Sequence, residues 1–228
     1  MFLGWGEELA FGVGMTLLTA VLSLFCGLAL GIGIATAKQS ENSLLRFLGD
    51  AYTTIIRGTP ELLIVFFVYF GSTIGASRVM GLISGKATYV EVPTLTASVV
   101  ALSVIFGGYA AESVRGAMLA LPKGQIEAAN AFGFSRFGCF LHIKLPLIWR
   151  YALPALGNNW LSLIKSTSLI SLVGLEELMR KTYIAAGDTG QHFRFYSIAA
   201  GIYLVLTLIN VFVLSHLEKY TRRSEKTL

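Results

Sequence analysis

The feature that most constrains this chain is a series of long apolar segments. A helix needs about 20 residues to cross roughly 30 Å of hydrocarbon. Five segments reach or approach this length: residues 9–37, 55–75, 94–115, 152–174 and 195–217. Because backbone in lipid must satisfy its own hydrogen bonds, each segment should be helical. The sequence therefore predicts an all-α, polytopic membrane protein with about five transmembrane helices.

Composition agrees with this class of protein. Apolar residues make up 54% of the chain and charged residues 14%, which is unusual for a soluble domain and excludes a disordered tail. The net charge of +5 needs no nucleic-acid partner, because membrane proteins retain basic residues on one side of the bilayer. We therefore expect membrane lipid around the chain and no nucleic acid.

The distribution of the 18 Lys and Arg residues predicts the orientation. Twelve lie in three segments on one side of the predicted spans: 38–57, 112–150 and 218–228. Five lie in two segments on the other side, 76–93 and 175–194, and Lys165 lies within a span. Residues 1–8 should therefore face the periplasm and residues 218–228 should form a basic cytoplasmic tail. Residues 175–194 are too polar to span, and we expect a short outer helix there.

No arrangement of residues typical of an enzyme is visible. The histidines, His142, His192 and His216, belong to three separate parts of the chain. The stretch from Gly81 to Lys86 resembles a phosphate-binding loop only loosely, since it is one residue short and lacks the following Ser or Thr. We expect no catalytic residue, cofactor or metal on this chain. If ATP powers it, another subunit must hydrolyse the ATP.

The most informative segment is the cytoplasmic connection at residues 120–149. A helix is expected from Glu127, a sharp reversal at Gly133, and a second amphipathic stretch that Pro146 should interrupt. Four phenylalanines punctuate this loop: Phe132, Phe134, Phe137 and Phe140. Exposed aromatic residues here favour burial against a protein partner, but a helix lying in the membrane interface explains them equally well.

The spacing within this loop resembles a known motif. Glu127-Ala128-Ala129, Gly133, Ile143 and Leu145-Pro146 match the EAA loop of bacterial ABC-importer permeases at every position. Three flanking motifs resemble the polar amino acid branch of that family: Arg57-Gly58-Thr59-Pro60, Tyr109-Ala110-Ala111-Glu112 and Lys165-Ser166-Thr167-Ser168-Leu169. That branch includes permeases for histidine, lysine, arginine, ornithine and the opines octopine and nopaline. The chain is similar to its Q-type subunits over nearly its whole length.

The resemblance implies a division of labour. Residues 9–217 would form a type I permease domain in the bacterial inner membrane, paired with a homologous second permease, preferably as a heterodimer. Two ATP-binding subunits would carry ATP and Mg and receive the loop as a coupling helix, and a periplasmic binding protein would deliver the solute. The residues in the loop motif would then couple transport to the ATPase. The alternatives are an ATP-independent channel or carrier, which the loop motif opposes, and a membrane-embedded enzyme, which the missing catalytic groups oppose.

Individual residues leave several interpretations open. Glu127 could cap its helix or pair with a basic residue of the ATPase, and Gly133 would fix the turn. Glu112 could simply pair with Arg115 three residues on, or attract a cationic solute. Lys165 could snorkel or contact neighbouring carbonyls, or bind a solute carboxylate. We include Tyr109 with Glu112 and Lys165 in a candidate substrate pathway.

Two glycines in the first span have a spacing that brings helices close together. Gly27 and Gly31 are four residues apart, so they lie on one face of a helix. We expect this face to pack within the permease, and contact with a second subunit is the weaker alternative.

Overall fold

A computed structural model of the protein describes residues 4–86 and 89–223, apart from the side chains of residues 220, 222 and 223. This part of the chain is helical and contains no strand. Its α-helices are α1 (Gly6–Lys38), α2 (Ser43–Gly58), α3 (Glu61–Ser84), α4 (Thr94–Leu119), α5 (Lys123–Ala131), α6 (Arg136–Cys139), α7 (Leu145–Ser166), α8 (Leu178–Thr189) and α9 (His192–Arg223). A π-helical turn covers Phe140–Lys144 and a 3-10 segment covers Thr167–Val173.

Four helices in the described ranges are long and apolar enough to cross a membrane: α1, α3, α4 and residues His192–Lys219 of α9. The remaining expected span, the fourth along the chain, corresponds to α7, which has 22 residues but carries polar side chains in its second half: Asn158, Asn159, Ser162 and Lys165. The all-α fold with about five membrane helices is thus confirmed.

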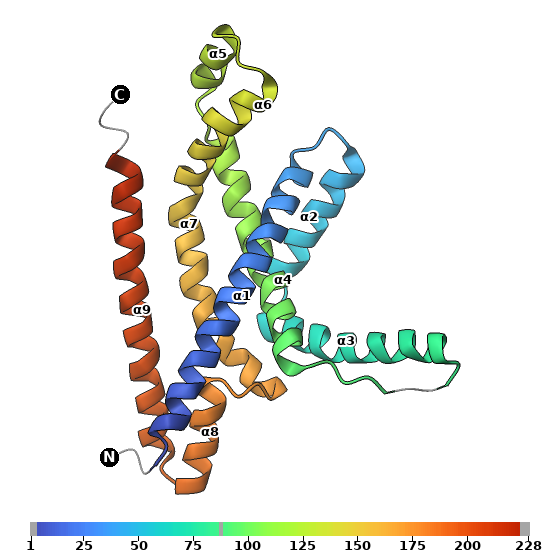
Figure 1. Ribbon diagram of the computed structural model, residues 1–228, viewed down its shortest axis with the longest axis vertical. Coiled ribbons are helices and arrows are strands. Elements are labelled where there is room, and N and C mark those ends of the chain that lie inside the picture. The colour runs from blue at the N-terminus through green and yellow to red at the C-terminus, as the bar shows by residue number, and fades with distance from the viewer. Residues whose placement is uncertain (1–3, 87–88, 224–228) are drawn as a thin grey trace.

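The molecule has two distinct ends (Figure 1). The loop that contains α5 and α6 lies at one end, and α8 lies at the other end beside the first turn of α1. Between them, α1 crosses α4 at close range. A β-carbon added to Gly27 would come within 2.8 Å of the Ser103 carbonyl oxygen, and one added to Gly31 within 2.8 Å of Ala110 Cβ. The small residues of α1 therefore serve packing within the chain.

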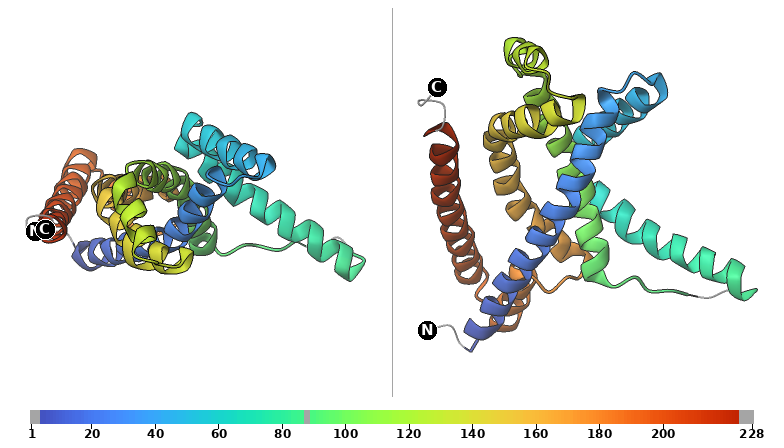
Figure 2. Two further views of the ribbon diagram at one scale, coloured as in Figure 1. Left: turned by 90° about the horizontal axis from the view of Figure 1, so that it is seen from above. Right: turned by 45° about the horizontal axis from the view of Figure 1, so that its top comes forward.

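The second span differs from the sequence expectation. The chain does not continue as one helix through residues 55–75, because α2 ends at Gly58 and α3 begins at Glu61 after an extended Thr59 and Pro60. Proline disfavours helical backbone in the residue before it, which explains the break at Thr59. Helix α3 then projects sideways from the other helices (Figures 1 and 2).

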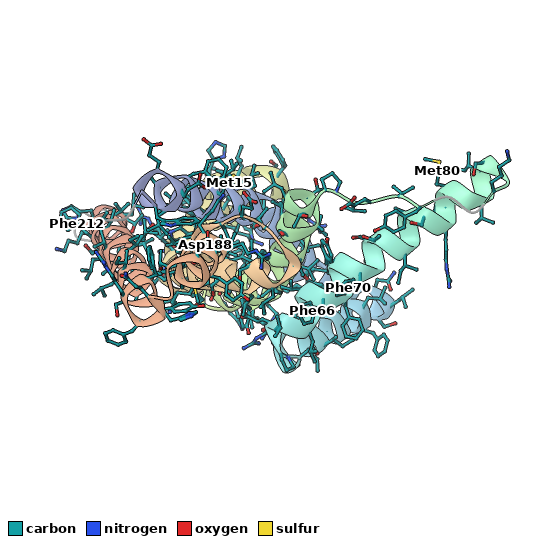
Figure 3. All side chains as sticks on the ribbon, turned by 90° about the horizontal axis from the view of Figure 1, so that it is seen from below. Met15, Phe66, Phe70, Met80, Asp188 and Phe212 are labelled. Carbon is teal, nitrogen blue, oxygen red and sulfur yellow. The ribbon has the colours of Figure 1, made fainter. Side chains whose placement is uncertain are left out.

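The far part of α3 lies well away from the rest of the chain. Figure 3 shows Phe66 and Phe70 nearer the body and Met80 toward the far end of the helix. Only Ile64 and Val65, in its first two turns, are buried.

The fourth span also has different bounds from the expected 152–174. Its α-helix starts at Leu145 and ends at Ser166, and the expected C-terminal part is the 3-10 segment ending before Gly174. Gly174 has φ +93°, a left-handed conformation that turns the chain toward α8. The predicted short outer helix is α8.

Candidate functional site

The loop at residues 120–149 folds as two short helices joined by a tight reversal. Gly133 has φ +79°, which glycine adopts without the penalty that a β-carbon brings. The Gly133 N–H donates to the Asn130 carbonyl oxygen at 3.0 Å, and the Phe134 N–H to the Ala129 carbonyl oxygen at 3.1 Å. These bonds close the end of α5 in the manner of a glycine C-cap. The expected turn at Gly133 is therefore present in the structure.

The expected interruption at Pro146 is wrong. The chain runs from α6 through a π turn into α7, and Pro146 lies in the first turn of α7. The Leu145 N–H donates to the Phe140 carbonyl oxygen five residues back, which is the π pattern. Proline has no N–H to donate, and Pro146 lies where the π hydrogen-bonding pattern changes to the α-helical pattern of α7. The fixed φ of proline also suits the start of a helix.

The motif residues divide into buried and exposed groups. Ala129 is buried and Ile143 is half-buried, whereas Glu127, Ala128, Gly133, Leu145 and Pro146 are exposed. Glu127 lies in the middle of α5, whose N-cap is Pro122, so it does not cap the helix. Within the described part of the chain it has no hydrogen bond or ion pair that would occupy its carboxylate. This leaves pairing outside the chain as the remaining interpretation.

Two phenylalanines make the loop surface strongly apolar. Phe132 is 85% exposed and Phe137 is 74% exposed, while Phe134 and Phe140 are less so. The loop that carries them, with α5 and α6, lies at the end of the molecule opposite α8 (Figure 1). Burying one exposed phenylalanine side chain stabilises the buried state by about 1.5–3 kcal/mol. Contact with a protein partner or with the lipid interface would therefore be favourable for this surface.

The loop is connected to the interior by continuous helical structure. From Arg136 to Ser166 the chain is helical throughout, through α6, the π turn and α7, which contains Pro154. Ile148 and Ala152 of α7 are buried in the main apolar core. The helix that leads from the loop is therefore packed into the interior of the molecule.

The far half of α7 lines a cavity of about 200 Å³ between α3, α4 and α7. Its walls are Glu61, Phe106, Tyr109, Asn159, Ser162, Leu163 and Ser166. Five of these seven side chains carry polar atoms. Because polar groups at membrane depth are costly, this cluster is a candidate functional site.

Contacts fix several of these side chains in place. The Ser166 hydroxyl donates to Glu61 Oε2 at 2.6 Å, and Asn159 Nδ2 donates to Ser113 Oγ at 2.9 Å. The Arg57 guanidinium carbon lies 5.9 Å from the centre of the Tyr109 ring, within cation–π range. The cavity thus combines a carboxylate, an amide and hydroxyls, which suits a small polar solute with a positive charge.

Glu112 does not line this cavity. Its carboxylate is bound by Lys38 of α1 and, at 2.8 Å, by Arg115 on its own helix. Lys38 also contacts Asp50 at 3.0 Å and donates to Thr53 Oγ1 at 2.7 Å. These contacts join α1, α2 and α4, and they favour the pairing interpretation of Glu112 over a role in attracting solute.

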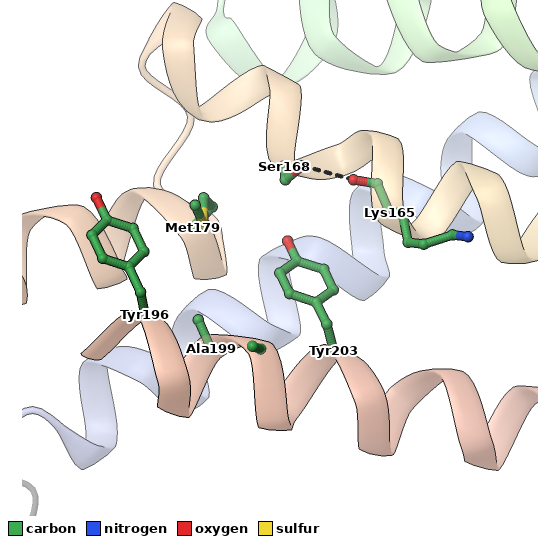
Figure 4. A pocket seen from close by; sticks show the side chains of 7 residues that line it. Lys165, Ser168, Met179, Tyr196, Ala199 and Tyr203 are labelled. Carbon is green, nitrogen blue, oxygen red and sulfur yellow. Dashed lines mark hydrogen bonds between the residues drawn. The ribbon is translucent and has the colours of Figure 1, made fainter. Parts of the chain in front are cut away.

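Lys165 of α7 does not line the cavity that contains Tyr109 of α4. It borders a second cavity, of about 290 Å³, together with residues of α8 and α9 (Figure 4). Its carbonyl oxygen accepts a hydrogen bond from the Ser168 hydroxyl at 2.8 Å, and its ammonium group points away from Tyr196. The three candidate pathway residues are therefore not brought together.

Sequence reasoning missed Glu61, Asn159 and Lys38. The signal for Glu61 was the proline before it, because a helix broken at Pro60 restarts with Glu61 at its N-terminus. No signal in the sequence pairs Lys38 with Glu112, which lies 74 residues away.

The family model of the binding-protein-dependent transport system inner membrane component matches residues 27–223. The chain belongs to this family. As a permease of this family it is a membrane subunit of a transport system and not an enzyme, and it is a multi-pass inner-membrane protein.

Relatives with known names match nearly the whole permease. It is 42% identical to the nopaline transport system permease protein NocQ of Agrobacterium fabrum, over 98% of this chain and 95% of that protein. It is 37% identical to the arginine ABC transporter permease protein ArtQ of Escherichia coli, over 96% of each chain. Among solved structures, a chain of an amino acid ABC transporter crystallised with histidines matches with a TM-score of 0.81, 29% identity and 96% coverage of both chains.

Proposed function

We propose that this permease subunit moves a polar or basic amino acid, or an opine, across the inner membrane by alternating access that ATP hydrolysis on partner subunits drives. Its relatives are named for nopaline, octopine and arginine transport, and for histidine, lysine, arginine and ornithine transport. Glu61 gives the cavity a negative charge that suits a basic side chain. ATP and Mg are bound by the partner ATPase and not by this chain.

The observation that carries the proposal is the continuity of α6, the π turn and α7. One end of this helical segment bears the exposed motif loop, and the other end forms a wall of the polar cavity. Closure of the ATP-binding subunits pulls on the loop, and α7 carries the displacement to Asn159, Ser162 and Ser166. A stiff connection is required, because coupling needs a movement that biases the spans between two states.

The substrate pathway follows the cavity between α3, α4 and α7. Tyr109 keeps the role that the sequence suggested, and Glu61 takes the place of Glu112 as the acidic group. Lys165 remains a candidate for a solute carboxylate only if the solute also reaches the second cavity, on the α8 and α9 side of α7.

The partners follow from the two ends of the chain. The loop end faces two ATP-binding subunits in the cytoplasm, in keeping with the concentration of Lys and Arg on that side. The opposite end, where α8 lies, faces the periplasm and receives the solute-binding protein. Similarity to Q-type subunits favours pairing with a homologous sister permease, so that the core is a heterodimer.

An ATP-independent channel or carrier is the alternative. To separate the two, the chain is co-expressed with its sister permease and ATP-binding subunit, and reconstituted in liposomes that contain ATP. Labelled arginine and the cognate binding protein are then added outside. We expect uptake that requires both ATP and the binding protein and stops with a non-hydrolysable ATP analogue. Arginine flux of equal rate without ATP would establish the alternative and reject our proposal.

A further inference from the structure

Glu177 is a buried carboxyl that the proposed transport cycle does not yet use. It is the N-cap of α8, at the end of the molecule opposite the motif loop, and its residue exposure is 0%. Its Oε1 accepts the Arg180 backbone N–H at 2.9 Å. Its Oε2 accepts the hydroxyls of Thr16 and Tyr203, each at 3.2 Å. One carboxyl thus joins α8 to α1 and α9.

No cation neutralises this carboxyl within the described residues. Lys181, one turn further along α8, is bound by Glu8 and Glu176 instead, each at 2.8 Å. The Arg180 guanidinium lies over the Tyr183 ring at 5.6 Å. Burial raises the pKa of the Glu177 carboxyl, and its hydrogen bonds act in the opposite direction. Hydroxyls and a backbone N–H therefore hold this side chain, and an uncharged amide of the same shape can take its place.

Close backbone packing reinforces the same junction. A β-carbon added to Gly12 of α1 would come within 2.9 Å of Leu178 Cα, so α1 touches the first residue of α8 directly. The Leu178 N–H donates to Thr16 Oγ1 at 3.2 Å. Leu178 itself is fully buried with Phe195 of α9. The start of α8 is thus held by α1 and α9 together.

We propose that Glu177 is a positioning residue for transport, which fixes the outer helix α8 to α1 and α9 so that docking of the binding protein on α8 reaches the spans. This rests on the proposed function, in which α8 faces the periplasm. Helix α8 follows α7 along the chain, so the segment from Arg136 to Thr189 links the ATPase side to the binding-protein side. Glu177 ties the outer part of that segment to two further spans.

The variants separate hydrogen bonding from charge and from packing. In Glu177→Gln the amide oxygen still accepts the Arg180 N–H, and its NH₂ group donates to Thr16 and Tyr203, whose hydroxyls also accept hydrogen bonds. Glu177→Leu fills a similar volume but leaves three donors unpaired. Tyr203→Phe removes the hydroxyl that donates to Glu177 and that also interacts with Thr16 and Thr167. Tyr196→Phe is its matched control on α9, since the Tyr196 hydroxyl has no hydrogen bond within the described residues.

The test uses the complete complex in liposomes and measures ATP hydrolysis with and without arginine-loaded binding protein. We expect Glu177→Leu to keep its basal hydrolysis but to lose about tenfold in maximal stimulation, and Tyr203→Phe to lose about threefold. Glu177→Gln and Tyr196→Phe should stay within about twofold of the wild type.

The outcomes separate the two proposals. Wild-type stimulation in both Glu177→Leu and Tyr203→Phe would overturn the role of Glu177. If Glu177→Leu does not assemble, Tyr203→Phe measured against Tyr196→Phe decides, and equal stimulation in these two overturns it. Absence of stimulation in the wild type, with the binding protein loaded in turn with arginine, histidine, lysine, ornithine, octopine and nopaline, would instead reject the proposed function.

Discussion

The Ser166 hydroxyl donates a hydrogen bond of 2.6 Å to Glu61 Oε2 and joins the last turn of α7 to the first turn of α3. This contact places a carboxylate in the cavity that also holds Tyr109 and Asn159. The helix carrying Ser166 is the one that leads from the motif loop. In the proposed transport cycle, motion of the loop would therefore change the position of the Glu61 carboxylate.

Replacing Glu61 with Gln removes the negative charge of the carboxylate and keeps the shape of the side chain. Charge-assisted hydrogen bonds contribute about 1.5–3 kcal/mol, so we expect the half-saturating concentration for arginine uptake to rise roughly 10- to 100-fold. Concentration-dependent uptake in liposomes measures this. Glu91→Gln, in the connection between α3 and α4, is the control and should not change the half-saturating concentration. An unchanged value in Glu61→Gln would remove Glu61 from the pathway.

Substitution of Gly133 tests the turn. A β-carbon there meets nothing within 4 Å, so a penalty arises only from its left-handed backbone, about 1–2 kcal/mol for most residues. We expect Gly133→Val to lower the ratio of arginine transported to ATP hydrolysed, and Gly133→Asn to be milder because asparagine tolerates this conformation. Equal ratios in valine, asparagine and wild-type complexes would show that the turn is not needed.

The exposed phenylalanines test the docking surface. Phe132→Ala and Phe137→Ala should each weaken association with the ATP-binding subunit by about 1–3 kcal/mol, as expected for a large side chain buried in an interface. Recovery of the ATP-binding subunit with tagged permease in detergent measures this. Phe193→Ala is the control, because Phe193 is 89% exposed in the first turn of α9, away from the loop. Recovery that drops equally in all three variants would argue against a specific surface.

The Glu112 cluster is predicted to be structural. The Glu112 side chain is 18% exposed and the Lys38 side chain only 8%. Glu112→Gln should therefore lower the free energy of unfolding of the detergent-solubilised complex by about 1–3 kcal/mol. Asp50→Asn should cost about 0–1 kcal/mol, because Asp50 is 63% exposed. Thermal unfolding measures both. A normal melting temperature in Glu112→Gln with weakened arginine uptake would restore Glu112 to the substrate pathway.

Local sequence patterns predicted the features that depend on residues close together in the chain. Long apolar segments identified the membrane helices, and Gly133 identified a reversal that its positive φ confirms. The predicted interruption at Pro146 was wrong, because the sequence did not indicate the π turn before it. Contacts between residues far apart in the sequence could not be predicted. Lys38 contacts Glu112, and Thr16 contacts Glu177, 161 residues away, only because the helices pack together.

We propose that the loop from Glu127 to Pro146 docks on an ATP-binding subunit and not on the membrane surface. The most direct test replaces Phe137 with a photo-crosslinking phenylalanine analogue in the assembled complex in membranes. After irradiation we expect a covalent adduct with the ATP-binding subunit, and none when the analogue is placed at residue 193. Adducts with lipid alone at residue 137 would contradict the claim.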